Sequence, residues 1–117
     1  MNFIPATIDS SKKVKCKSVE INCDLGSFKE NDSVQLAIRP EEIYFQQENQ
    51  DDNVILAIIK EIEFLGSFQR VYFEAKSLTN ELIIVDVPST SARKIKLNID
   101  EEMNLYFSKQ DARIYST

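Results

Sequence analysis

The 117-residue chain contains no histidine, no tryptophan and only two glycines, Gly26 and Gly66. Without histidine there is no Ser-His-Asp or Cys-His pair for nucleophilic catalysis, no histidine-ligated zinc and no histidine switch near neutral pH. Phosphate loops and dinucleotide fingerprints need two or three glycines within about eight residues, because the backbone must approach phosphate closely. The two glycines are too far apart for either motif. We therefore expect a protein that is not an enzyme and that holds no cofactor or metal.

Acidic residues outnumber basic residues, 19 to 14, and the net charge is −5. Sequence-independent nucleic-acid binding requires a basic surface that displaces counterions from phosphate, so we expect no nucleic-acid partner. Basic residues cluster only within 12–17, where strand alternation would place Lys13, Lys15 and Lys17 on one side. The pattern favours a solvated, edge-protecting strand face over an anion-binding stripe.

The two cysteines, Cys16 and Cys23, are separated by six residues. This spacing fits neither a metal knuckle nor a redox pair, so buried free thiols in a reducing compartment are expected. The longest nearly continuous apolar run, 54–59, is too short to span a membrane, and no secretion signal is recognisable. The sequence therefore favours a cytoplasmic protein.

Short segments in which apolar residues recur with a period of two dominate the chain. Such segments predict strands at 14–17, 19–23, 34–38, 54–65, 71–75, 82–87, 95–99 and 103–107. The segment 54–65 fits a helix or a long strand by periodicity, and its β-branched content favours a long, bent strand. Turn-forming residues separate the segments at intervals of roughly eight to twelve residues, which predicts an all-β fold, a small barrel or sandwich.

One polar stretch, 48–53, is long enough to act as a linker. It divides the chain into halves of about 1–47 and 54–117. Neither half is large enough to bury a stable hydrophobic core by itself. We therefore expect a single domain, 1–117, whose halves share one core.

Two internal repeats compete. Leu-Gly-Ser-Phe occurs at 25–28 and at 65–68, but in different contexts, a loop start and the end of a long strand. The second repeat aligns 34–38 with 103–107, an offset of 69, because each alternating segment follows an acidic turn and precedes a polar, acid-containing corner. The second repeat covers more of the chain, and we favour it.

Three stretches of the sequence resemble a known family. Asn-Phe-Ile-Pro-Ala-Thr-Ile at 2–8 resembles the opening that follows the nucleotide-binding domain in many ABC importer ATPases. The strand at 34–38 followed by Arg-Pro-Glu-Glu looks like a motif of their C-terminal regulatory region, and 59–67, ending in Phe-Leu-Gly-Ser, is similar to the stretch that opens its second half. Together these motifs resemble the TOBE (transport-associated OB) domain over nearly the whole chain.

The resemblance implies an OB-like β-barrel or sandwich built from two TOBE-type halves. It also implies a non-catalytic C-terminal regulatory and dimerisation domain of an ABC importer ATP-binding subunit, separated here from its ATPase domain. The implied partners are that ATPase domain, a second copy in a homodimer and, indirectly, the membrane-spanning importer subunits at the inner membrane. The alternative is a small-molecule or oxyanion-sensing OB-like domain, for which a small-molecule effector is possible.

Two motifs supply the candidate site residues. Proline removes a backbone donor and forces an extended conformation on the preceding residue, so Arg39, Pro40 and Glu41 are expected to form a corner. A contact with a partner subunit or with the ATPase domain, or a role in ligand binding, is the alternative. The segment Leu65, Gly66 and Ser67 is expected to form a bulge or tight turn in which glycine takes a positive φ. A small-anion site at the Ser67 hydroxyl is the alternative.

Overall fold

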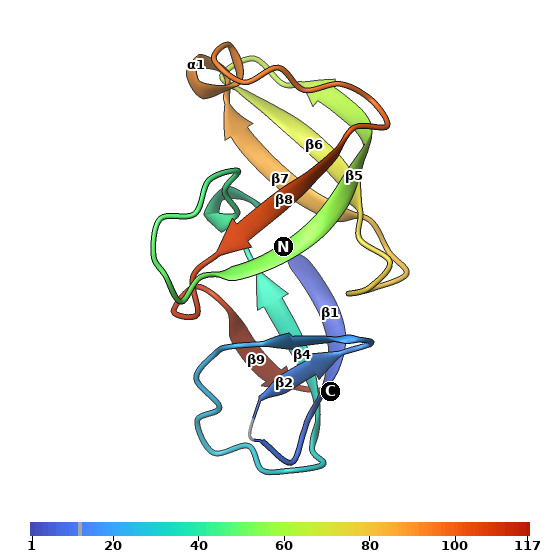
Figure 1. The fold of residues 1–117 in the computed structure, drawn as a ribbon, viewed down its shortest axis with the longest axis vertical. Coiled ribbons are helices and arrows are strands. Elements are labelled where there is room, and N and C mark those ends of the chain that lie inside the picture. The colour runs from blue at the N-terminus through green and yellow to red at the C-terminus, as the bar shows by residue number, and fades with distance from the viewer. Residues whose placement is uncertain (12) are drawn as a thin grey trace.

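The computed structural model describes residues 1–11 and 13–117, so Lys12 of the basic cluster lies outside the described residues. Nine strands form two sheets, which we call lobe 1 and lobe 2 (Figure 1). Lobe 1 contains β1 (Asn2–Ile8), β2 (Val14–Cys16), β3 (Val19–Ile21), β4 (Ser33–Ile38) and β9 (Arg113–Ser116). Lobe 2 contains β5 (Asn53–Phe64), β6 (Phe68–Glu74), β7 (Ile83–Pro88) and β8 (Glu102–Phe107), with the short helix α1 (Ser89–Ala92). A 3₁₀ turn, η1 (Pro40–Glu42), follows β4. The all-β prediction is confirmed.

The two sheets have the same strand arrangement. Lobe 1 has the order β3-β2-β1-β4-β9 and lobe 2 the order β7-β6-β5-β8, with antiparallel neighbours throughout. Each lobe pairs with a segment that is closer in sequence to the other lobe. β9, which follows the last strand of lobe 2, pairs with β4 of lobe 1, and Tyr44, which follows β4, pairs with Tyr106 of β8 in lobe 2. Both hydrogen bonds of the Tyr44–Tyr106 pair are 2.8 Å long. The lobes are therefore linked by reciprocal exchange of short segments.

A further repeat, between β1 and the start of β5, accompanies the shared strand order. β1 reads Asn-Phe-Ile-Pro-Ala-Thr-Ile and the start of β5 reads Asn-Val-Ile-Leu-Ala-Ile-Ile, so Asn, Ile, Ala and Ile recur at an offset of 51. These four are the buried positions of each segment. β4 and β8, the strands of the favoured 69-residue repeat, then occupy equivalent places beside β1 and β5. The offset grows along the chain because β5 is longer than β1 and because α1 and 93–101 are inserted before β8.

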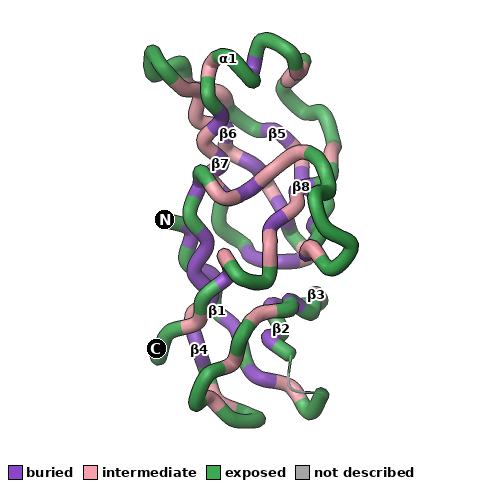
Figure 2. The backbone as a smooth tube through the Cα atoms, turned by 90° about the vertical axis from the view of Figure 1, so that its left-hand side faces the viewer, coloured by how far each residue is buried: buried purple, intermediate pink, exposed green. Residues whose placement is uncertain are grey.

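Buried residues alternate with more exposed ones along the strands (Figure 2), because successive side chains of a strand lie on opposite faces of the sheet. The largest fully buried side chains include Ile4, Leu36 and Ile38 in lobe 1 and Phe73, Leu105 and Phe107 in lobe 2. They belong to one cluster of buried residues that includes strands of both lobes. The division into 1–47 and 54–117 remains a prediction, and the position of β9 shows that the sheets exchange strands across it.

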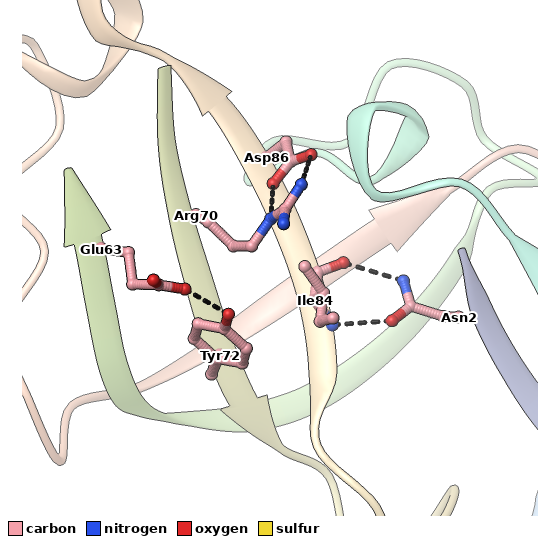
Figure 3. A network of polar contacts seen from close by, with 6 residues as sticks. All are labelled: Asn2, Glu63, Arg70, Tyr72, Ile84 and Asp86. Carbon is pink, nitrogen blue, oxygen red and sulfur yellow. Dashed lines mark hydrogen bonds and ion pairs between the residues drawn. The ribbon is translucent and has the colours of Figure 1, made fainter. Parts of the chain in front are cut away.

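Two asparagines at the starts of β1 and β5 connect the lobes. The Asn2 side chain donates to the Ile84 carbonyl oxygen at 2.8 Å and accepts from the Ile84 amide at 2.7 Å (Figure 3). Asn53 does the same with Asn22, at 2.9 and 2.8 Å. Both asparagines are buried, each 5% exposed. We call these pairs the asparagine clamps. Each satisfies an amide and a carbonyl of the opposite lobe, away from bulk water.

The predicted strand at 95–99 is wrong. After α1 the chain runs through 95–101 without strand pairing, and Ile99 is half-exposed. The segment connects α1 to β8 and reaches the sheet only at its end, where Asp100 donates its amide to the Ile59 carbonyl at 2.7 Å and Glu101 accepts from the Ile59 amide at 3.0 Å. An alternating pattern forms a strand only where a neighbouring strand pairs with it. The long strand predicted at 54–65 is confirmed as β5, with a register shift between Ile59 and Glu61.

Candidate functional site

An open groove of about 790 Å³ lies between the 23–28 loop and the segment that leads into β9. Two cationic side chains, Lys109 and Arg113, line it together with the partly buried Leu25, Phe28 and Ile114. Gly26, with a φ of +56°, shapes the loop and donates its amide to the Asp24 carboxylate at 3.0 Å. We call this the β9 groove. Asp24 also lines it, so the groove combines two basic side chains and one carboxylate with apolar surface. The net positive charge suits a small anion or an anionic group on a larger ligand.

Lys109 of the β9 groove is already engaged. Its ammonium lies 2.8 Å from the Asp51 carboxylate, which raises the pKa of Lys109 and lowers that of Asp51. Both groups are exposed, so the pair contributes little free energy. The second cation, Arg113, makes no ion pair with a described residue.

A second groove of about 510 Å³ lies where η1, β7 and α1 meet. Its lining includes three carboxylates, one ammonium and two aromatic side chains: Glu41, Glu48, Asp86, Lys94, Tyr44 and Phe45. We call it the η1 groove. Its carboxylates make it a poor site for an anion, in contrast to the β9 groove.

The corner predicted at 39–41 forms as the sequence indicates. Arg39 is extended, with φ −73° and ψ 139°, and Pro40 begins η1 and is buried. The Arg39 guanidinium lies 3.7 Å from the Glu42 carboxylate, and Glu41 lines the η1 groove. A role of this corner in partner contact remains a prediction.

The segment 65–67 joins β5 to β6 in a tight turn in which Gly66 has a φ of +83°. The turn is held against α1, because Ser89 donates its hydroxyl to the Gly66 carbonyl at 2.7 Å and its amide to the Ser67 carbonyl at 3.0 Å. Leu65 is 41% exposed. Of the six candidate residues, only Glu41 lines either groove.

Nothing in the sequence indicated that Glu42 and Asp111 would meet. These residues are separated by the 69-residue repeat offset and end the corners that follow β4 and β8. The Glu42 side chain is 18% exposed, and its Oε2 atom is buried without a hydrogen-bond partner among the described residues. Burial first, and the adjacent Asp111 carboxyl second, raise the pKa of Glu42 against the opposing effect of Arg39. The ionised form of Glu42 is therefore less favourable in the folded protein than in water.

Further polar pairs lie on the outer side of β6. Arg70 makes two hydrogen bonds to Asp86, at 2.9 and 3.1 Å, and Tyr72 donates to Glu63 (Figure 3). The Asp86 and Glu63 carboxylates raise the pKa values of Arg70 and Tyr72 respectively. These pairs are internally satisfied and tie neighbouring strands together.

The cysteine thiols are poor nucleophiles. Burial raises the pKa of Cys16 to about 12 and that of Cys23 to about 11, so both stay protonated at neutral pH. Within the described part of the chain, no group of three or more acidic or cysteine side chains is arranged to hold a metal ion. No helix among residues 1–11 and 13–117 is long and apolar enough to cross a membrane.

Comparison with known proteins gives one family and one fold neighbour. The family model of the TOBE domain matches residues 36–114, more than half of the chain. No curated protein matches. The structure is similar to that of the cytoplasmic molybdate-binding protein ModG with molybdate bound, with a TM-score of 0.74 and 10% identity over 99% of this chain and 96% of ModG. At this identity the likeness shows the fold alone. The expected OB-like fold built from two TOBE-type halves is confirmed.

Proposed function

The chain belongs to the TOBE domain family, and from this premise we propose that it is the non-catalytic regulatory and dimerisation domain of an ABC importer ATP-binding subunit. The family match and the fold support a binding or regulatory domain. Attachment to the ATPase domain of an ABC importer is the more specific part of what we propose. In that context the domain acts on the cytoplasmic side, attached to an ATPase domain and linked through it to the membrane-spanning subunits.

The observation that carries the proposal is apolar surface on the outer sides of the sheets. Phe3, Val54 and Leu56 are each about half-exposed (49, 50 and 51%) and project outward from β1 and β5. Val54 and Leu56 are neighbours on the outward side of β5, and grouped exposed apolar side chains of this kind are typical of sites of protein association. A domain that holds ATPase subunits together needs such a surface.

Regulation then follows from linkage. A ligand or protein that binds this domain changes transport only if its affinity differs between the open and closed arrangements of the attached ATPase domains. No step of this account requires catalysis, a cofactor or nucleic acid.

Sedimentation velocity over a wide range of protein concentration tests self-association. We expect species heavier than the 13.5 kDa monomer to grow with concentration. A chain that stays monomeric at the highest concentration would contradict the dimerisation role. The ABC context is tested by the genome: an ATP-binding subunit of an importer should be encoded in the same reading frame or beside it, and absence of both would contradict it.

A second candidate function, oxyanion binding, is supported by the β9 groove. Lys109 and Arg113 give this groove positive charge, and ModG, which has a similar fold, binds molybdate. Calorimetric titration with molybdate, sulfate and phosphate tests the candidate. We expect binding of one anion that Arg113→Gln abolishes and the control Arg93→Gln, outside the groove, leaves unchanged. A flat titration with every anion would remove this candidate.

A further inference from the structure

The outward positions of the two lobes form two equivalent surfaces. They follow from the repeat: positions 3, 5 and 7 of β1 correspond to positions 54, 56 and 58 of β5. The lobe 1 face consists of Phe3, Pro5, Thr7, Lys15, Arg113 and Tyr115. The lobe 2 face consists of Val54, Leu56, Ile58, Glu74, Glu102 and Tyr106.

The strand registers fix these surfaces. Thr7 lies opposite Lys15 of β2, and its counterpart Ile58 lies opposite Glu74 of β6 and Glu102 of β8. At the opposite edge of the same lobe 1 face, Tyr115 of β9 pairs with Gln35 of β4, which itself pairs with Pro5 of β1. Each face therefore has an apolar centre on β1 or β5 and charged residues on the strands beside it.

The borders of the two faces have opposite net charge. Lys15 and Glu74 occupy the same structural position and differ in sign. Each has an opposite charge near it, because Glu20 of β3 pairs with Lys15 and the Lys76 ammonium lies 3.8 Å from the Glu74 carboxylate. Arg113 on β9 and Glu102 on β8 then make the lobe 1 border basic and the lobe 2 border acidic. The segregation extends to the whole chain. Residues 1–38 and 113–117 contain six basic and five acidic residues, whereas 39–112 contain eight basic and fourteen acidic residues.

We propose that the lobe 1 face of one copy packs against the lobe 2 face of another copy, a contact that rests on the self-association proposed above and names its surface. Phe3 and Pro5 then meet Val54 and Leu56, and the basic border of one face meets the acidic border of the other. Two equal faces would not associate as well. In a contact between two lobe 1 faces, the basic residues Lys15 and Arg113 of both copies would face each other. In a contact between two lobe 2 faces, carboxylates would face carboxylates. Like charges that meet at an interface cost free energy.

A contact between unlike faces leaves one free face on each copy. Copies joined in this way close into a ring of two or more, or extend into a filament. A wild-type assembly held by complementary charges at its rim also weakens as salt is added.

Charge reversal in pairs tests the contact. Lys15→Glu alone and Glu102→Lys alone should each weaken self-association about tenfold or more, because like charges then face each other. An equimolar mixture of the two variants should associate like the wild type, because the introduced carboxylate of one variant then meets the introduced ammonium of the other. The matched controls Lys29→Glu and Glu81→Lys reverse exposed charges outside both faces and should leave association unchanged. Sedimentation of fluorescently labelled chains measures each combination.

The outcomes separate the surface from the function. A wild-type chain that associates while Lys15→Glu and Glu102→Lys behave like their controls would overturn the surface and leave the dimerisation role intact. A wild-type chain that remains monomeric would overturn both. A monomeric chain that binds a single-stranded oligonucleotide through Lys15 would assign the lobe 1 face to nucleic acid and overturn the proposal.

Discussion

Lobe 1 and lobe 2 share a strand order and a buried motif but differ on their surfaces. The four residues that recur between β1 and β5, Asn, Ile, Ala and Ile, are the ones that face the interior or clamp the other lobe. At the outward positions the two lobes have different residues, such as Thr7 and Ile58, or Lys15 and Glu74. Burial therefore restricts residue identity in both lobes alike, whereas exposure leaves each lobe free to present its own charge.

The lobes also differ in how their cores are filled and their charges paired. Phe73 of β6 occupies the position that Val14 occupies in β2, and it lies against Phe45 with ring centroids 6.0 Å apart. All five ion pairs between described residues lie within 39–111. Lobe 2 thus contains the larger aromatic core and the denser charge network.

The largest expected effect is at this unequal pair of core positions. Phe73→Ala should lower the free energy of unfolding by about 3–5 kcal/mol, because it removes a fully buried ring and leaves a cavity. Val14→Ala should lower it by about 2 kcal/mol. Urea unfolding followed by circular dichroism measures both. A single transition is expected in each variant because the core spans both lobes, and a two-step curve would show that the lobes unfold separately.

The asparagine clamps should be equal in the two lobes. Asn2→Ala and Asn53→Ala each leave an amide and a carbonyl of the other lobe without a partner, so each should cost about 1–3 kcal/mol of unfolding free energy. Asn104→Ala, at an exposed position, is the control and should change stability by less than about 0.5 kcal/mol. Equal stability of the clamp variants and the control in urea would show that the clamps are unimportant.

The two Leu-Gly-Ser-Phe copies provide a smaller comparison. Gly26 and Gly66 both have a positive φ, +56° and +83°, and an added Cβ would contact nothing within 4 Å at either site. Gly26→Ala and Gly66→Ala should therefore each cost about 1 kcal/mol through backbone strain alone. Thermal unfolding beside Ser27→Ala as control measures this. A much larger loss at one glycine would mean that its turn does more than reverse the chain.

The smallest effect concerns pH at the Glu42–Asp111 junction. Because the pKa of Glu42 is raised in the folded protein, its stabilising contribution is complete below the ordinary carboxyl pKa and is lost as pH rises through the raised value. Glu42→Gln should therefore be more stable than the wild type at neutral pH and should flatten the stability profile in the mildly acidic range. Glu41→Gln, at an exposed neighbour, is the control. A profile for Glu42→Gln that parallels the wild type would contradict this account.

Local patterns predicted much of this fold. Period-two alternation located β4, β5 and β8, and the proline and glycine positions located the corner at 39–41 and the turn at 65–67. The strand predicted at 95–99 is wrong because a local pattern does not show whether a neighbouring strand pairs with the segment, which here connects α1 to β8. β9 has only four residues and forms because β4 offers it an edge.

Less of the candidate site could be predicted from the sequence. The Asn-x-Ile-x-Ala-x-Ile motif was present at 2–8 and 53–59, but its offset of 51 differs from the 69 that relates β4 to β8, so no single alignment contains both. The clamps, the Glu42–Asp111 contact and the meeting of Lys109 and Arg113 with the 23–28 loop in one groove join residues far apart in the chain. Such contacts depend on tertiary structure, which the spacing of residues does not encode.

Dilution of the isotope-labelled chain, followed by amide resonances, tests the central claim most directly, because one experiment reports on both lobes. The claim is that unlike faces of the two lobes meet between copies. The account predicts concentration-dependent shifts at the outward residues of β1 and of β5 together, near Phe3 and Leu56, and none at α1. Shifts confined to one lobe, or an unchanged spectrum across the dilution, would contradict it.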